Sequence, residues 1–180
     1  MFDSIKNYFA KPAKEQIFTW KYIDIDKSLV DEIQDIYLKH LDPDLSNYCF
    51  FQATAIKVPN VLGIKVKHCC LVYSKGNEKP QFSHKDPIVD STFALNIPLK
   101  NCENSITRLY KDNKKPMYAF TTKGRLTEVQ PIEKSVFLTS YVLDKPLLFN
   151  TQILHSVENF SPEPRLAISL RFKKNPMEWL

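Results

Sequence analysis

The chain has 180 residues, 43% of them hydrophobic, and a formal net charge of +5, so we expect one domain over residues 1–180 with its core at about 48–172. The four cysteines contain no CxxC pair, which excludes a disulfide framework and a zinc finger and predicts free thiols in a reducing compartment, the cytoplasm. No apolar run approaches bilayer length, and the modest, scattered positive charge does not by itself indicate nucleic acid.

Two helices are predicted in the N-terminal part of the chain. Residues 1–10 have the apolar spacing of a short amphipathic helix. From about Ser28 to Leu41, apolar residues recur on one helical face, and Ser28 with Asp31 forms an approximate N-terminal cap. We expect both helices to pack against a sheet.

The rest of the chain has the pattern of short strands. Such runs at regular spacing favour an all-β sandwich or barrel with helical decoration over parallel β/α units. Gly76 and Gly124 mark the clearest tight turns, and Asn77, Asn113 and Pro116 are expected in others. The predicted strand runs cover 16–25, 48–58, 64–73, 91–99, 105–110, 117–122, 135–140, 146–150, 153–160 and 165–172.

A candidate metal site begins in the stretch FSHKD, residues 82–86. Alternate side chains of a strand share a face, so His84 and Asp86 project together and Lys85 points the other way. The triplet alone is common by chance, and a lone histidine is usually structural. A third ligand is offered by His155 in the later run ILHSVENF, and two histidines with one carboxylate is the arrangement of non-haem Fe(II) oxygenases.

The last predicted strand carries a candidate anion-binding arginine. In RLAISLRF, the alternate residues Arg165, Ala167, Ser169 and Arg171 share one face. An arginine that points inward needs an anionic partner to offset its desolvation, and a ligand carboxylate can accept two parallel hydrogen bonds from the guanidinium. Arg171 is the rival to Arg165, although a salt bridge near the mouth of the site fits it better.

Three further polar residues stand in apolar strands. Asn96 and Asn150 could each donate to a cosubstrate or substrate, or each could satisfy a neighbouring backbone group. Tyr110 shares a face with Arg108 and could reach inward.

Taken in chain order, His84, Asp86, His155 and then Arg165 resemble the 2-oxoglutarate- and Fe(II)-dependent dioxygenases, whose fold is the double-stranded β-helix, or cupin-like jelly roll. The segments FALNIPLKNCENSITRLY and PLLFNTQILHSVENFSPEPRLAISLRF are similar to a group of small phage and bacterial proteins of that superfamily. The similarity covers about residues 80–172, and a viral chain would work in the cytoplasm of its host.

The resemblance implies a cofactor set and a role for each residue. His84, Asp86 and His155 would bind Fe(II), and Arg165 would bind the distal carboxylate of 2-oxoglutarate, with O2 as the second cosubstrate. The usual Arg-x-Ser motif is broken because position 167 is alanine, so Ser169 or Tyr110 would supply the hydroxyl group. The carboxylate of Asp86 favours hydroxylation over halogenation.

The substrate and the competing classes stay open at this stage. Lysines in the segments 74–81 and 111–128 suit an anionic small molecule, a nucleotide or a nucleic acid, and a peptide side chain also fits. The alternatives to a dioxygenase are a non-catalytic jelly-roll binding protein, which has no use for an inward arginine, and a metal-dependent cupin without cosubstrate, which commonly uses more histidines. The sequence does not indicate an oligomeric state.

Overall fold

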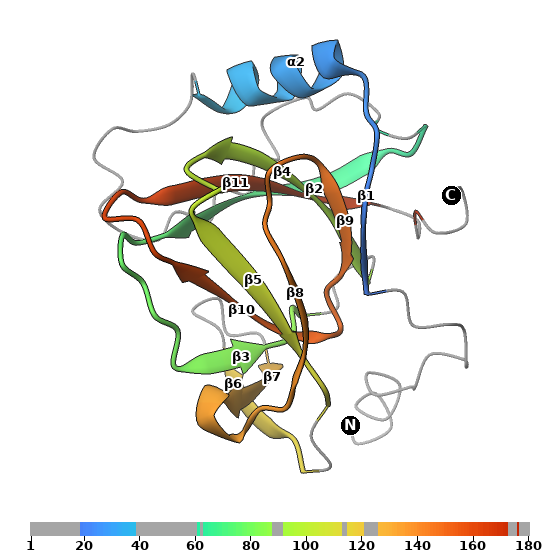
Figure 1. The fold of residues 1–180 in the computed structure, drawn as a ribbon. Helices are drawn as coiled ribbons and strands as arrows, with labels where there is room; N and C mark the ends of the chain where they lie inside the picture. The colour runs from blue at the N-terminus through green and yellow to red at the C-terminus, as the bar shows by residue number, and fades with distance from the viewer. Residues whose placement is uncertain are drawn as a thin grey trace.

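The computed structural model describes residues 19–38, 61, 63–87, 92–112, 115–120, 126–172 and 176. Over these ranges the chain is mainly β, with two antiparallel sheets and one α-helix (Figure 1). The predicted helix at 1–10, the predicted strand at 48–58, Asn113 and Gly124 lie outside the described residues.

The first sheet has five strands in the order β1-β9-β4-β11-β2. The interior strand β11 pairs with β4 on one side and with β2 on the other, so both edges of this strand are hydrogen-bonded. The strands are β1 (Trp20–Tyr22), β2 (Val66–Ser74), β4 (Phe93–Lys100), β9 (Leu147–Asn150) and β11 (Arg165–Phe172).

The second sheet has six strands in the order β6-β7-β3-β10-β5-β8. Its strands are β3 (Phe82–His84), β5 (Ser105–Tyr110), β6 (Met117–Phe120), β7 (Leu126–Pro131), β8 (Phe137–Tyr141) and β10 (Leu154–Asn159). A short 3-10 helix, η2 (Ile132–Lys134), follows β7.

One strand in the second sheet was not predicted from the sequence. β7 reads LTEVQP, which lacks the alternation of apolar and polar residues that marks a half-buried strand. It is extended because β3 and β6 pair with its two edges. Every other predicted run outside 48–58 contains a strand.

The helix α2 (Lys27–Leu38) covers the outer face of the first sheet, above β4, β11 and β2 in Figure 1. Its cap differs from the predicted one, because Oδ1 of Asp26 accepts a hydrogen bond from the Ser28 backbone N–H at 2.8 Å, which makes Asp26 the capping residue. Residues 39–41 of the predicted helix lie outside the described ranges. None of the described helices combines the length and the apolar character needed to cross a membrane.

Two apolar clusters lie on opposite faces of the first sheet. On β11, Ile168 and Leu170 belong to the cluster under α2, whereas Ala167 belongs to the cluster between the two sheets. Because side chains alternate along a strand, Arg165, Ser169 and Arg171 share the side of Ala167. We call this side, which faces the second sheet, the inner face.

The turns use residues that tolerate a left-handed backbone. Asn77 and Asn101 have φ values of 54° and 55°. Gly76, beside Asn77, is required for a different reason: a Cβ atom at this position would lie 1.8 Å from the carbonyl oxygen of Pro162. The loop after β2 and the loop after β10 therefore pack backbone against backbone.

Candidate metal centre

The structure brings His84, Asp86 and His155 together. β3 pairs with β10 so that His84 lies opposite His155, and the two imidazole centroids are 4.5 Å apart. Oδ1 of Asp86 lies 3.6 Å from Nε2 of His84 and 3.7 Å from Nε2 of His155. One ligand atom from each side chain lies within 4.8 Å of the other two. β3 ends at His84, so Asp86 follows the strand and is not part of it.

Backbone contacts set the tautomer of His155. Its Nδ1 atom lies 2.8 Å from the carbonyl oxygen of Ile153, and because a carbonyl only accepts, Nδ1 is the protonated nitrogen. Nε2 therefore carries the lone pair and faces Asp86, as in a metal ligand held by an outer hydrogen bond. Burial, followed by the charge of His84, lowers the pKa of His155 to about 4, so the imidazole is neutral at pH 7.

Asp86 is held through both its backbone and its carboxylate. Its N–H donates to the carbonyl oxygen of Thr151 at 3.0 Å, and its carbonyl accepts from Nε2 of Gln152 at 3.0 Å. Its Oδ2 atom accepts a hydrogen bond from Nη2 of Arg171 on the inner face of β11. Burial alone would raise the pKa of Asp86, but the charge of Arg171 and the contacts with His84 and His155 hold it well below its usual value. The group is therefore a carboxylate at neutral pH.

The geometry of the three donors fits a divalent first-row metal ion. Ligand bonds of about 2.1 Å place neighbouring donor atoms about 3 Å apart in an octahedral site and about 3.4 Å apart in a tetrahedral one. The two Asp86–histidine distances, 3.6 and 3.7 Å, are slightly longer than these values. The exposed fraction of the side chain rises from 8% for His155 to 22% for Asp86 and 46% for His84, so the centre opens on the His84 side.

Arg165 is buried on the same inner face. The residue is only 3% exposed, and within the described part of the chain its Nε and Nη1 atoms have no hydrogen-bond partner. Buried guanidinium groups normally bind carboxylates or carbonyls, because an unpaired buried cation loses its hydration without replacement. Arg165 therefore has the donor capacity to bind an anion between the sheets.

Other polar groups line the inner face near Arg165. Ser169 pairs in register with Asn96 across β11 and β4, and Oδ1 of Asn96 is buried with no hydrogen-bond partner among the described residues. Tyr141 pairs in register with Thr107 across β8 and β5. Burial raises the pKa of Tyr141 to about 12, although hydrogen bonds with Thr107 and Asn96 and the charge of Arg165 act in the opposite direction. The phenol is therefore neutral and is a hydrogen-bond donor.

The sequence did not single out Tyr141. The predicted run ended at Ser140, whereas β8 extends to Tyr141. Thr139 and Tyr141 are two residues apart and would share one face of an extended strand, so strand alternation was the signal in the sequence that could have identified Tyr141. The charges of both Arg165 and Asp86 affect its pKa, so this phenol lies within electrostatic range of both ends of the inner face.

Two predicted site residues lie elsewhere. Tyr110 does share a face with Arg108, but that face is opposite to the one that carries Leu109, the residue in register with His155. Its hydroxyl lies 3.1 Å from Oγ of buried Ser156. Tyr110 therefore does not reach the inner face, because strand alternation turns it away from the metal centre.

Asn150 satisfies a neighbouring backbone group, which was the structural alternative to ligand binding. Its Oδ1 atom accepts a hydrogen bond from the Gln152 N–H at 2.9 Å and so stabilises the turn between β9 and β10. Its neighbour Phe149 belongs to the cluster between the sheets, so Asn150 points to the other face of β9.

Lys85, between the two ligands, is part of an ion cluster. Its Nζ atom lies 3.0 Å from Glu128 and 3.1 Å from Asp112, and its side chain is 16% exposed. Burial would lower the pKa of Lys85, but these two carboxylates raise it above its usual value. Lys85 points away from His84. Its ion pair with Glu128 of β7 therefore attaches the segment that carries His84 and Asp86 to that strand.

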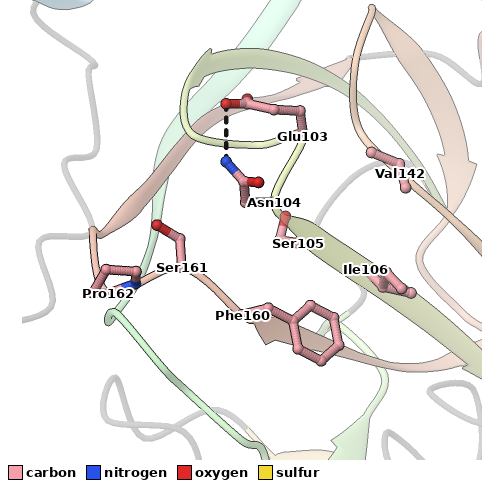
Figure 2. A pocket seen from close by; sticks show the side chains of 8 residues that line it. All are labelled: Glu103, Asn104, Ser105, Ile106, Val142, Phe160, Ser161 and Pro162. Carbon is pink, nitrogen blue, oxygen red and sulfur yellow. Dashed lines mark hydrogen bonds between the residues drawn. The ribbon is translucent and has the colours of Figure 1, made fainter.

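A shallow hollow elsewhere on the surface contains none of the candidate residues. Glu103, Phe160 and Pro162 are among the residues that line it (Figure 2). It includes the first residues of β5, Ser105 and Ile106, whereas the residue opposite His155 is near the other end of that strand. The hollow is therefore separate from the metal centre.

No protein-family model matches this chain, and no curated protein matches it. The functional assignment therefore depends on the geometry of the inner face and on the order of its residues along the chain.

Proposed function

We propose that this chain is a 2-oxoglutarate- and Fe(II)-dependent dioxygenase of the hydroxylase type. One observation carries the proposal: a cluster of three possible metal donors lies on the inner face, and so does buried Arg165, whose Nε and Nη1 have no hydrogen-bond partner among the described residues. A metal ion alone does not explain Arg165, because a buried cation at this position requires an anion. A cosubstrate that is both a metal chelator and a carboxylate explains both features.

The order of strands supports a double-stranded β-helix. β2, β11, β4 and β9 are neighbours in the first sheet, and β3, β10, β5 and β8 are neighbours in the second. The chain passes from one sheet to the other between β2 and β3, β3 and β4, β4 and β5, β8 and β9, β9 and β10, and β10 and β11. Two interleaved four-stranded antiparallel sheets with these crossings have the connectivity of a jelly roll.

Each residue has a defined task in this proposal. His84 and His155 would bind Fe(II) through Nε2, and Asp86 through Oδ1, while Arg171 neutralises the remaining carboxylate oxygen. With 2-oxoglutarate and O2, Fe(II) in such a centre supplies oxidation of a C–H bond, and succinate and CO2 are the coproducts. The apolar neighbours of His155, such as Phe149 at 4.8 Å between ring centroids, exclude water from the inner side of the centre.

Arg165 would bind the distal carboxylate of 2-oxoglutarate by two parallel hydrogen bonds. Tyr141 replaces Tyr110 as the proposed hydroxyl donor, because Tyr141 lies on the inner face and is protonated at neutral pH. Ser169 and Asn96, which pair in register on that face, complete the polar wall. A neutral phenol and a guanidinium together favour a carboxylate over an uncharged ligand.

The cytoplasm is the proposed compartment. Cys102 is a free thiol in the structure, and a reducing compartment preserves both free thiols and Fe(II).

The proposal is tested by adding Fe(II) and 2-oxoglutarate without oxygen and recording the visible metal-to-ligand charge-transfer absorption. Oxygen is then admitted and succinate is measured. We expect both signals in the unaltered protein and neither in His155→Ala or Asp86→Ala. Arg165→Met should retain metal binding but need a higher 2-oxoglutarate concentration, because it keeps the volume and loses the charge.

Arg108→Met is the matched control, since Arg108 pairs with Glu158 at 2.9 Å on the face of β5 that carries Tyr110. Unchanged succinate formation in Asp86→Ala would overturn the ligand assignment. Metal binding without any dependence on 2-oxoglutarate would instead indicate a cupin-like enzyme. The absence of both the charge-transfer absorption and succinate would indicate a binding protein.

A further inference from the structure

The two candidate histidine ligands belong to one transverse row of side chains across the second sheet. His155 pairs with His84, His84 pairs with Val129 of β7, and Val129 pairs with Met117 of β6. Residues directly opposite each other in antiparallel strands project to the same face. Val129 and Met117 therefore extend the inner face outward from His84, which is the ligand on the open side of the centre.

A second row runs beside the first. Phe82, two residues before His84 on β3, pairs with Pro131 of β7. Since residues i and i+2 of a strand share a face, Phe82 and Pro131 lie on the same side as His84 and Val129. We call Phe82, Met117, Val129 and Pro131 the apolar platform.

The platform is accessible at its two largest side chains. Phe82 is 48% exposed and Met117 is 50% exposed. Strands are about 4.8 Å apart, so Met117 lies about 10 Å from His84 across β7, and Phe82 lies about 7 Å from His84 along β3. A group bound on the platform would be next to the open side of the metal centre.

Two described cations next to the centre, Arg171 and Lys85, do not favour an anion on this surface. Arg171 is paired with Asp86, and Lys85 is paired with Asp112 and Glu128. Each of these two cations already has a carboxylate partner, so a phosphate or carboxylate of a substrate would have to displace that partner. An uncharged group requires no such exchange, and it gains from contact with Phe82 and Met117.

We propose that the apolar platform binds an uncharged aromatic or aliphatic part of the substrate and holds it beside the metal centre. This inference rests on the proposed oxygenase function, because it names the substrate class of the same site. It makes Phe82 a specificity-determining residue. It is an alternative to the anionic substrate predicted from the lysines in segments 74–81 and 111–128, which stays a prediction.

The probe for the test is indole, a flat and uncharged aromatic molecule, and inorganic phosphate is the comparison. The methyl group of Met117, labelled with carbon-13 and assigned with Met117→Leu, is followed by NMR during each titration. In a second measurement, Mn2+ fills the metal centre and the line widths of the indole protons are recorded. The first measurement needs no metal, so it tests the platform independently of the proposed metal site.

We expect indole, and not phosphate, to shift the Met117 methyl signal, and bound Mn2+ to broaden the indole lines. Phe82→Ala should weaken indole binding about fivefold. Phe120→Ala is the matched control, because Phe120 is 75% exposed in the same sheet but lies three residues from Met117 on β6, so strand alternation turns it to the opposite face. It should leave indole binding unchanged.

Three results would overturn the inference: no shift of the Met117 methyl with indole, equal losses in Phe82→Ala and Phe120→Ala, or a shift with phosphate alone. Failure of Mn2+ to bind the unaltered protein would instead contradict the metal centre. Because Phe82 is half exposed, Phe82→Ala should fold, and its midpoint of thermal unfolding checks this. Phe82→Leu, which keeps an apolar side chain, should retain most of the affinity.

Discussion

The guanidinium group of Arg171 binds Oδ2 of Asp86 and leaves Oδ1 of the same carboxylate facing the two histidines. Arg171 belongs to the first sheet, and Asp86 follows a strand of the second, so this ion pair joins the two sheets at the candidate metal centre. It determines which carboxylate oxygen is available to a metal ion.

Replacing Arg171 by methionine should weaken metal binding while the three ligands remain present. Loss of an outer partner of a metal ligand typically lowers affinity about 10- to 100-fold, because the ligand is no longer oriented. The affinity is measured by competition between the protein and a chelator for Zn2+. Arg108→Met, which removes the pair between Arg108 and Glu158, should leave it unchanged. Equal affinities in the two variants would contradict the orienting role of Arg171.

The two tyrosines provide a direct test of the inner face. Tyr141→Phe removes one hydroxyl on the inner face and should weaken 2-oxoglutarate binding about 5- to 10-fold, which corresponds to one hydrogen bond of about 1 kcal/mol. Tyr110→Phe removes a hydroxyl that contacts Ser156 on the opposite face and should have no effect on this affinity. The measurement is an anaerobic titration of the charge-transfer absorption. A loss of 2-oxoglutarate affinity in Tyr110→Phe alone would contradict the proposal, because the cosubstrate would then bind on the face of β5 opposite to the inner face.

The stability of the metal-free protein should fall as the pH drops below 6.5. The pKa of His155 is about 4 in the folded chain against 6.5 in an unfolded one, so the unfolded state binds a proton first. The stabilisation is present above pH 6.5 and is lost as the pH falls towards 4. At pH 4.5 the loss is on the order of 2 to 3 kcal/mol, since one pKa unit is worth about 1.4 kcal/mol.

Urea unfolding at pH 7.5 and pH 4.5 measures this loss, and His155→Asn should show a smaller difference between the two conditions. Asp86 titrates far lower, so its effect lies below this pH window. If both proteins lost the same free energy of unfolding, His155 would not be the group responsible.

Gly76→Ala should destabilise the fold because its Cβ atom would lie 1.8 Å from the carbonyl oxygen of Pro162. A backbone atom cannot move aside as a flexible side chain can, so we expect a loss of about 2 kcal/mol or more in the free energy of unfolding. Gly63→Ala is the comparison: Gly63 has φ of +69° but no atom within 4 Å of the added Cβ, so the loss should be about 1 kcal/mol. Thermal unfolding of both variants gives the ranking, and a larger loss at Gly63 would contradict the close packing at Gly76.

Much of the β-structure could be predicted because its signal is local. The run RLAISLRF alternates apolar and polar residues, and β11 places Ile168 and Leu170 under the helix and Ala167 on the inner face, as that alternation requires. β7 escaped prediction because its sequence has no such alternation, and its extended state comes from pairing with β3 and β6. The helix was placed correctly, but its cap is Asp26 because the aspartate carboxylate accepts the Ser28 N–H.

The sequence by itself determined the nature of the donors: two histidines and an arginine on strands whose alternation gives each a definite face, and a carboxylate two residues after one of these strands ends. It did not determine which faces meet. Tyr110 and Tyr141 are equivalent as side chains, and only the register of β5 with β10 and β8 turns one away from the metal centre and the other towards Arg165. Asp86 and Arg171 are far apart in the chain, and only the packing of the two sheets makes them an ion pair. Strand alternation depends on neighbouring residues, whereas register and sheet packing depend on contacts between distant ones, so the tertiary structure decided how the site is assembled.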